Sequence, residues 1–298
     1  MNNLLLNKSF LYNIRKYCRQ LVNKKFLPPI FYLMLFNLEK SLCGRNNLKI
    51  AYKGDHFQVS ELHNGKFILW SFPRSNRIRG WLYVGGLINR ANDLAEGYGI
   101  NKLNFKDDDV IIDCGANFAD LWLYLNNTKK NLQYIAIEPG FDEFQVIRRN
   151  LDFNSSQILS QGFDVALSDH CGSSVFYYSP NGADSSLIKP FGESKEYNIE
   201  CITLTKLLFE LDLSNRYIKL LKLEAEGWEP EILEGASEII SKIEYIAADV
   251  GPERGENKEN TLSNVANILY KHNFLIYSSQ ITGYRTTLLF KNQRLENL

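Results

Sequence analysis

The stretch from Val110 to Asp120 limits most strongly what this 298-residue chain can fold into. Three consecutive β-branched residues, 110–112, predict a strand that is buried on both faces. Asp113 closes the strand, Gly115 allows a tight turn, and residues 118–125 have the length and apolar spacing of a helix. A strand, a glycine turn and a helix N-terminus together form a nucleotide-sized site at the carboxyl edge of a sheet.

The residue types in this turn favour a cationic cofactor over a dinucleotide. The dinucleotide fingerprint G-x-G-x-x-G needs its second glycine so that the backbone can approach a pyrophosphate, but Asn117 stands at that place. Asp113 adds an acid at the strand tip, which would repel a pyrophosphate. The same acid suits S-adenosylmethionine, which carries an ammonium and a sulfonium. The alternative is an ordinary strand-turn-helix unit that binds no ligand.

The charge of the chain is balanced overall but unevenly distributed. The chain has 34 basic and 34 acidic residues, so its total charge gives no case for nucleic-acid binding. Residues 1–46 hold eight Lys or Arg and one acid, a net charge of +7 that leaves −7 on the remainder. We expect a basic amphipathic helix over residues 3–25 and a second helix over 30–42. Such an arm either lies on an anionic membrane or packs on the domain or on a second subunit of a homodimer.

Cysteine use predicts a reducing compartment, and hydropathy predicts no membrane-spanning helix. The five cysteines form no C-x-x-C pair, and with four histidines they make no zinc pattern. The most apolar run, residues 30–36, is far shorter than the roughly 20 residues of a membrane-spanning helix. The first residues are not typical of a signal peptide. We therefore expect a cytoplasmic protein that is soluble or bound peripherally at a membrane.

Strands and helices alternate regularly after the central stretch. We expect strands over residues 134–138, 157–166, 217–223 and 244–250, and helices over 141–151, 203–211, 229–241 and 261–271. Five strands joined by helices imply a parallel sheet, and a hairpin over 274–279 and 284–290 adds an antiparallel strand. Residues 167–197 are irregular and predict a lid or a hairpin insertion. Short antiparallel strands over 48–70 and a helix over 89–96 precede the sheet.

Four segments of the chain, in order, are similar to motifs of one family. Residues 112–117 look like the D-x-G-A-N motif of the FkbM-type S-adenosylmethionine-dependent methyltransferases. Residues 137–139 (I-E-P) resemble the family's second strand, and 166–176 its A-L-S-D-x-x-G-x-x-x-F element. Residues 221–236 are similar to K-x-D-x-E-G-x-E-P-x-x-L-x-G-A, and the resemblance covers about residues 100–291.

The resemblance implies an α/β class I methyltransferase fold that is Rossmann-like. Its seven-stranded, mostly parallel sheet has strand order 3-2-1-4-5-7-6 with strand 7 antiparallel, and its reaction is the methylation of an oxygen. We expect a basic helical arm over residues 1–46, a β-rich and helical accessory segment over 47–100, and the methyltransferase domain over 101–298.

Two departures from the family pattern bear on activity. Ala119 replaces the usual glycine, and its extra methyl is harmless if its φ is negative. Glu224 replaces an aspartate, and the extra methylene moves the carboxylate by about 1 Å, a misplacement that can cost on the order of 10²-fold in rate. These departures leave open a weak or inactive methyltransferase-like fold that acts as a binding module at a membrane or on a partner protein.

The cofactor-binding residues are expected at the tips of the first three strands. Glu138 lies 25 residues after Asp113, where a carboxylate accepts hydrogen bonds from both ribose hydroxyls. Asn117 and Asp120 stand at the helix start, where they cap the helix or hold the amino-acid end of the cofactor. The full expected set is Asp113, Gly115, Ala116, Asn117, Asp120, Glu138, and, at the adenine edge, Asp164 and Val165.

Carboxylates beyond the fourth and fifth strands are the catalytic candidates. Glu226 is the expected base, and Glu224 orients the acceptor or the amine of the cofactor. Asp249 lies at the tip of the fifth strand, and Lys222 either pairs with these acids or extends to solvent. No resident metal is predicted, although the carboxylates would also suit a divalent cation. We interpret Glu229 and Glu231 as first-turn acids that stabilise a helix dipole.

The acceptor is expected to be a hydroxyl of a sugar, in a glycan or glycolipid, or of a secondary metabolite. This substrate class follows from the resemblance alone, and no nucleic-acid partner is expected. A nicotinamide dehydrogenase is the remaining alternative, and Asn117 argues against it.

Overall fold

The computed structural model describes residues 13, 15–24, 27–154, 156–179, 185–282 and 285–295. The chain divides into two compact units, the first ending at Leu87 and the second beginning at Ile88. The division into three parts expected from the sequence stays a prediction. Of the basic helix expected over residues 3–25, residues 15–22 are helical, whereas residues 1–12 lie outside the described part of the chain.

The first unit packs a helix on a small antiparallel sheet. Helix α2 (Pro29–Leu42) precedes the strands β1 (Leu48–Tyr52), β2 (His56–His63) and β3 (Lys66–Pro73), which pair in chain order. Tyr32 and Phe36 of α2 are fully buried, and the Tyr32 ring lies 4.7 Å from the ring of Phe57. The short helical segments η1 (Arg74–Asn76), α3 (Arg77–Gly80) and η2 (Trp81–Tyr83) follow. The helix and strands expected over residues 30–70 are thus confirmed.

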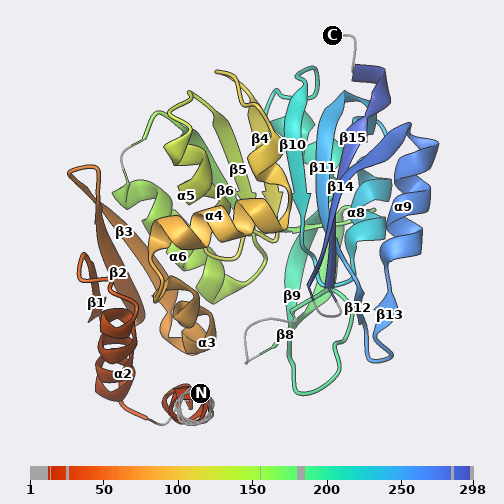
Figure 1. Ribbon diagram of the computed structural model, residues 1–298. Helices are drawn as coiled ribbons and strands as arrows, with labels where there is room; N and C mark the ends of the chain where they lie inside the picture. Colours follow the sequence, from red (N-terminus) through yellow and green to blue (C-terminus); the bar gives the residue numbers. More distant parts are fainter. Residues whose placement is uncertain are drawn as a thin grey trace, which may run out of the picture. The chain divides into compact units, whose positions relative to one another are not determined.

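The second unit is built on a seven-stranded sheet (Figure 1). Its strands, in spatial order, are β14 (Phe274–Thr282), β15 (Arg285–Asn292), β11 (Ile243–Val250), β10 (Ile218–Leu223), β4 (Val110–Cys114), β5 (Gln133–Ile137) and β6 (Leu159–Phe163). Strands β6, β5, β4, β10 and β11 are parallel, and β15 is antiparallel to both of its neighbours. Numbered along the domain, this order reads 3-2-1-4-5-7-6, so the expected class I methyltransferase topology is confirmed.

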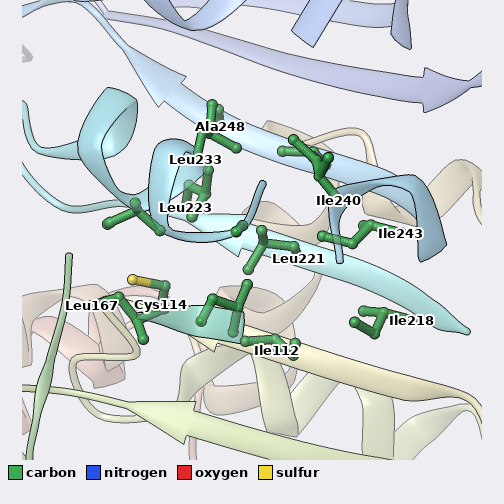
Figure 2. Packing of buried hydrophobic residues seen from close by; sticks show 14 of the residues in the cluster. Ile112, Cys114, Leu167, Ile218, Leu221, Leu223, Leu233, Ile240, Ile243 and Ala248 are labelled. Carbon is green, nitrogen blue, oxygen red and sulfur yellow. The ribbon is translucent and has the colours of Figure 1, made fainter. Parts of the chain in front are cut away.

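Helices cover both faces of this sheet. The helices are α4 (Leu87–Gly97), α5 (Asp120–Asn127), α6 (Phe141–Phe153), α7 (Leu204–Glu210), α8 (Glu229–Gly235) and α9 (Leu262–Lys271). Alternate residues of β4, namely 110, 112 and 114, join one apolar core with buried residues of α7, α8 and α9. Figure 2 shows Ile112 and Leu221 in this core, with Leu233 of α8 among the side chains above them. Figure 1 shows α4 on the side of the sheet opposite to α8 and α9.

The segment between β6 and α7 is a hairpin insertion, one of the two alternatives expected. Strands β8 (Gly172–Tyr178) and β9 (Lys195–Ile202) pair in antiparallel fashion and, with the short β7 (Ala166–Leu167), form a separate sheet of order β7-β9-β8. The single strand expected over residues 157–166 is therefore two strands, β6 and β7. Strands β12 (Pro252–Arg254) and β13 (Glu259–Asn260) form another small pair.

Helices α5 and α8 differ from their expected bounds. Helix α5 begins at Asp120 rather than at residue 118, because Asn117 and Ala119 have left-handed backbone conformations. Helix α8 ends at Gly235, and the short helix η4 (Ile240–Lys242) completes the expected stretch. The expected inward residues of that stretch, Ile232, Leu233, Ala236 and Ile240, are all buried. Short helices η3 (Ile100–Lys102) and η5 (Gln293–Leu295) complete the second unit.

None of the helices in the described ranges combines the length and the apolar character that crossing a bilayer requires. The cytoplasmic location stays a prediction.

Candidate active site

The carboxyl ends of the parallel strands β4, β5 and β10 meet at one edge of the sheet. The backbone N–H of Glu224, after β10, donates to the carbonyl of Cys114 at 3.1 Å. The N–H groups of Gly115 and Ala116, after β4, both donate to the carbonyl of Ile137, at 3.0 and 3.1 Å. Backbone hydrogen bonds therefore join the loops after β4 and β10 to the last residues of the neighbouring strands β5 and β4. The site is built directly on the sheet.

Gly115 is required by the closeness of the loops after β4 and β10. Its φ is +70°, in the left-handed region, and a Cβ at this position would lie 1.8 Å from the carbonyl oxygen of Glu224. No real Cβ makes such a contact. The glycine of the D-x-G-A-N stretch thus makes room for the neighbouring strand end.

Ala119 does not meet the condition under which its methyl is harmless. Its φ is +63°, and Asn117 two residues earlier has a φ of +54°. Asparagine tolerates this region, whereas an alanine there costs roughly 1–2 kcal/mol. Ala119 is fully buried. The replacement of the usual glycine therefore strains the backbone at the start of α5.

Glu138 holds the loop after β4 with its carboxylate. Its Oε2 accepts a hydrogen bond from the Asn117 N–H and its Oε1 accepts one from the Gly140 N–H, both at 2.8 Å. The side chain is buried at the end of β5, as expected. The Glu138 carboxylate thus joins the loop after β4 to the loop after β5.

Asp113 does not present its charge to an open rim, which corrects the premise from the sequence. Its Oδ1 lies 3.0 Å from Nζ of Lys222, and its Oδ2 accepts a hydrogen bond of 2.6 Å from the hydroxyl of Tyr134. All three side chains are buried. Successive residues of β4 face opposite sides of the sheet, which explains this position. Residues 110, 112 and 114 face the apolar core, and Asp113 faces the other side, beside Lys222 of β10.

Lys222 pairs with acids, which was one of the two alternatives expected for it. Besides Asp113, its Nζ contacts Oε2 of Glu224 at 3.1 Å and lies 5.4 Å from the ring centre of Tyr98. Burial alone would lower the pKa of Lys222, but the carboxylates of Asp113 and Glu224 raise it above its ordinary value. The hydroxyl of Tyr98 is hydrogen-bonded to Glu224, and burial raises the pKa of this phenol. Glu224 is thus held from two sides.

A second charged group surrounds Arg285, the first residue of β15. The Nε of Arg285 contacts Oδ2 of Asp249 at 3.1 Å and Oε1 of Glu253 at 2.7 Å, and its Nη2 lies 3.6 Å from Oε1 of Glu226. The other oxygen of Asp249, Oδ1, is buried and has no hydrogen-bond partner among the residues that the structure describes. Burial raises the pKa of Asp249 to about 7, although Arg285 opposes the shift.

Glu229 braces the loop that carries Glu224 and Glu226. It stands in the first turn of α8, as expected, but its Oε1 accepts hydrogen bonds from the N–H groups of Ala225 (2.8 Å) and Gly227 (3.3 Å). Burial raises the pKa of Glu229 to about 7. Its first-turn position is the expected one, and its carboxylate in addition holds the acidic loop through these two hydrogen bonds.

Comparison with known proteins decides which family this architecture belongs to. Residues 113–276, more than half of the chain, match the methyltransferase FkbM domain. The chain belongs to this family. The resemblance seen in the four motifs is thereby confirmed, the FkbM domain is that of an S-adenosylmethionine-dependent methyltransferase, and a nicotinamide dehydrogenase is no longer an alternative.

Relatives and solved structures resemble only part of the chain. The methyltransferase sdnD of Sordaria araneosa is 26% identical over 163 residues, which are 45% of this chain and 63% of that protein, so the chain spans less than two thirds of this relative. The M. capricolum TrmK structure with S-adenosyl-homocysteine is 14% identical, with 68% of each chain covered and a TM-score of 0.40. Magnesium protoporphyrin IX methyltransferase from Synechocystis PCC 6803 with bound SAM is 10% identical, with 69% and 79% covered and a TM-score of 0.40.

The charges at this edge favour a cationic cofactor. Glu226, Asp249 and Glu253 surround the single guanidinium of Arg285, so acids outnumber the cation there. Asn117 keeps a side chain where a pyrophosphate would need glycine. This excess of negative charge favours a cofactor that carries an ammonium and a sulfonium over one that carries phosphates, which would add to it. The described residues contain no group of three His, Cys, Asp or Glu side chains placed to hold a metal ion.

The remaining predicted residues lie around this edge in different environments. Asp120, at the first position of α5, is buried and accepts a hydrogen bond of 2.8 Å from Nε of Arg90. Asp164 is exposed and lines a surface cavity of about 400 Å³ between α6 and β6. Val165 packs against the apolar core. Their contacts with a cofactor stay predictions.

Sequence reasoning missed three residues of the candidate site: Tyr98, Glu253 and Arg285. Tyr98 follows the last turn of α4, Glu253 lies in β12 and Arg285 begins β15. None of them belongs to one of the four motifs, and they reach the site only through the fold. The available signal was a basic residue near the glycine at which the sequence predicts a hairpin turn, and such a residue is too common to identify a site.

Proposed function

We propose that this chain transfers the methyl group of S-adenosylmethionine to a hydroxyl of a sugar, in a glycan or glycolipid, or of a secondary metabolite. Membership of the FkbM family supports methyl transfer. The observation that supports proton transfer is the buried Oδ1 of Asp249 at the acidic edge, which has no hydrogen-bond partner among the described residues. Four carboxylates (Glu224, Glu226, Asp249, Glu253) against two cations (Lys222, Arg285) disfavour acceptors with a phosphate backbone, so nucleic acid is not proposed.

The cofactor would be held by the loops after the first three strands. Glu138 accepts the ribose hydroxyls, because it is a carboxylate at the end of β5 beside the loop that follows β4. The backbone of residues 115–117 and the start of α5 at Asp120 face the amino-acid end. Asp164 and Val165 contact the adenine. When bound, the cofactor supplies an electrophilic methyl group on its sulfonium, and the residues of the chain position the acceptor and take its proton.

Asp249 is the base that the geometry favours, in place of the Glu226 expected from the sequence. A general base works best when its pKa lies near the working pH, and burial raises the pKa of Asp249 to about 7. Arg285 fixes Oδ2 of Asp249 and leaves Oδ1 to accept the proton of the acceptor hydroxyl. Glu226, on the same guanidinium, and Glu224, held by Lys222 and Tyr98, orient the acceptor.

Binding of the methyl donor is the first test. Calorimetry is done with S-adenosylmethionine, S-adenosylhomocysteine and NAD on the full chain. Micromolar binding of the first two and none of NAD is expected. Binding of none of the three would favour the inactive binding module and overturn the proposal.

Transfer is tested next with the acceptor found by intact-mass screening of hydroxyl compounds. Asp249→Asn is expected to lower the rate by about 10²–10⁴-fold and to keep binding of S-adenosylhomocysteine, because only the proton acceptor is lost. Glu226→Gln is expected to lower it less. Glu210→Gln, on the exposed end of α7, is the matched control. Full activity of Asp249→Asn would remove Asp249 as the base.

A further inference from the structure

Helix α2 carries apolar side chains on the face that its own unit does not use. Ile30, Met34, Leu38 and Leu42 follow one another at intervals of four residues, so they form one stripe along the helix. Their exposed fractions are 55%, 63%, 57% and 59%. Phe31, beside the stripe, is 48% exposed. We call these five residues the α2 stripe. A contiguous apolar surface of this kind on a helix marks an interaction site.

The fold of the first unit does not need the α2 stripe. The opposite face of the helix supplies Tyr32 and Phe36, both fully buried, and the hydroxyl of Tyr32 donates to the carbonyl of Arg77 at 3.0 Å. The helix is therefore already fixed to the antiparallel sheet through one face. An apolar second face on such a helix adds nothing to this packing, and water contact makes it unfavourable unless a partner covers it.

The exposed charge of the segment that carries the α2 stripe is of one sign. Arg15, Lys16 and Lys24 are exposed, in keeping with the net +7 of residues 1–46. The single acid of that segment, Glu39, is only 3% exposed and is paired with Arg19. Within the described part of residues 13–46, the surface therefore shows cations and apolar side chains and no exposed carboxylate.

We propose that the α2 stripe docks on the surface of an anionic lipid membrane, with basic residues of the same segment facing the lipid headgroups. Exposed apolar side chains on a helix and an excess of cations in the same segment both contribute to binding at such a membrane. A second copy of the chain fits less well, because pairing two stripes would bring two segments of +7 together. A nucleic acid would satisfy the cations but would leave the apolar stripe uncovered.

The test measures sedimentation of the full-length chain with vesicles. The probes are vesicles of phosphatidylcholine alone and of phosphatidylcholine with phosphatidylglycerol. Binding to the anionic vesicles is expected, with little binding to the neutral ones and a loss of binding as salt increases. The variant Met34→Glu with Leu38→Glu is expected to bind at least about ten-fold more weakly, because it places two anions in the stripe. Phe67→Glu changes a side chain that is 59% exposed on β3, outside the stripe, and should bind like the wild type.

Circular dichroism of each variant checks that the fold is kept, and neither readout depends on methyl transfer. Equal vesicle binding by the Met34→Glu, Leu38→Glu variant and the wild type would overturn the proposal, as would the absence of vesicle binding by the wild type. Analytical ultracentrifugation supplies the other decisive outcome: a dimer that the same variant abolishes, without vesicle binding, would assign the stripe to a second copy.

Discussion

Arg285 sets the charge balance around Asp249. Five other titratable groups also act on Arg285 or Asp249. Glu226 and Glu253 contact the guanidinium of Arg285. Glu224, Glu229 and Tyr98 lie close enough to interact electrostatically with this pair. The acids and the burial of Asp249 raise its pKa, while Arg285 lowers it. Because the ionised form of Asp249 is the proposed base, activity should rise as the pH passes through its pKa of about 7.

Arg285→Gln should move the acidic limb of the pH profile of kcat/KM to higher pH. Removing the cation leaves the burial and the neighbouring acids unopposed, so the pKa of Asp249 rises further and more alkaline conditions are needed to ionise it. The measurement is kcat/KM against pH with the acceptor identified by mass screening. Arg285→Lys keeps the charge and should shift the limb less.

The matched control for this experiment is Arg254→Gln. Arg254 is also paired with an acid, Glu231 (2.9 Å), and donates to the carbonyl of Gly227 at 2.7 Å, but no contact joins it to Asp249. Its loss should alter stability or rate without moving the limb. An Arg285→Gln enzyme whose limb coincides with that of the wild type would show that Arg285 does not control the proton affinity of the base.

Gly115→Ala should destabilise the second unit severely. The new methyl would lie 1.8 Å from the backbone oxygen of Glu224, and the left-handed φ of +70° adds strain. Overpacking of backbone typically costs about 1–3 kcal/mol, and the conformation adds roughly 1–2 kcal/mol. Urea unfolding followed by circular dichroism measures the loss. Gly97→Ala, where a Cβ meets nothing within 4 Å, is the control and should unfold at the wild-type midpoint.

Residues inside motifs were predictable from the sequence, and residues brought in by the fold were not. Glu138 stands at the end of a strand, so its place at the sheet edge followed from the strand pattern. The burial of Asp113 depends on its neighbour in the sheet, Lys222, which lies 109 residues later in the chain. Tyr98 and Arg285 come from opposite ends of the second unit, and no spacing rule joins them.

At the scale of elements, the loop that carries Glu224 and Glu226 is held to helix α8 by hydrogen bonds and close packing. Glu229 ties the N–H groups of Ala225 and Gly227 to the first turn of the helix, and a Cβ on Gly227 would lie 2.6 Å from the Cα of Arg254. At the other end, a Cβ on Gly235 would lie 2.0 Å from the carbonyl oxygen of Ser168. The glycines and the acid of the E-G-x-E-P-x-x-L-x-G-A stretch thus serve to pack this loop and helix closely.

The unfolding free energy of Glu229→Gln minus that of the wild type should be larger at pH 8 than at pH 5. Burial raises the pKa of Glu229 to about 7 from an ordinary 4.5, so the folded state binds a proton more readily than the unfolded state. The stability of the wild type therefore falls as the pH rises from about 4.5 to 7, and the cost is complete above pH 7. Glutamine does not titrate, so it escapes this cost.

The difference in unfolding free energy between the variant and the wild type should grow by about 1–3 kcal/mol from pH 5 to pH 8. An unpaired amide in the variant would lower its unfolding free energy equally at both pH values, so this effect cancels in the comparison. Urea unfolding at the two pH values measures the change, with the exposed Glu234→Gln in the same helix as control. A difference that is independent of pH would contradict the buried, ionisable state of Glu229.

Element types followed from periodicity, whereas element ends were set by backbone conformation. The five parallel strands and their helices were expected because each carries a repeating apolar pattern of sufficient length. The late start of α5 was not expected, since it depends on the left-handed φ of Ala119, a value that alanine rarely adopts. The β8–β9 hairpin was open between two alternatives, because neither strand carries a sustained apolar pattern: one residue of β8 and two of β9 are buried.

At the scale of the whole molecule, the proposed site and the proposed membrane surface belong to different compact units. All the strand ends that carry the proposed cofactor-binding residues lie in the unit that begins at Ile88, and the α2 stripe lies in the unit that ends at Leu87. This separation predicts that a cofactor stabilises one unit and leaves the other unchanged, since a ligand stabilises only the state that binds it.

Hydrogen exchange with S-adenosylhomocysteine tests this separation. At a concentration of about 100 times Kd, a ligand stabilises its folded site by roughly 2.7 kcal/mol, which slows exchange through opening of that unit by about 100-fold. Amides of β4, β5 and β10 should therefore be protected, whereas those of β1, β2 and β3 should exchange as they do without ligand. NAD at the same concentration should protect neither set. Equal protection of both sets would mean that the two units open together, and protection of β1–β3 alone would place the cofactor outside the sheet edge.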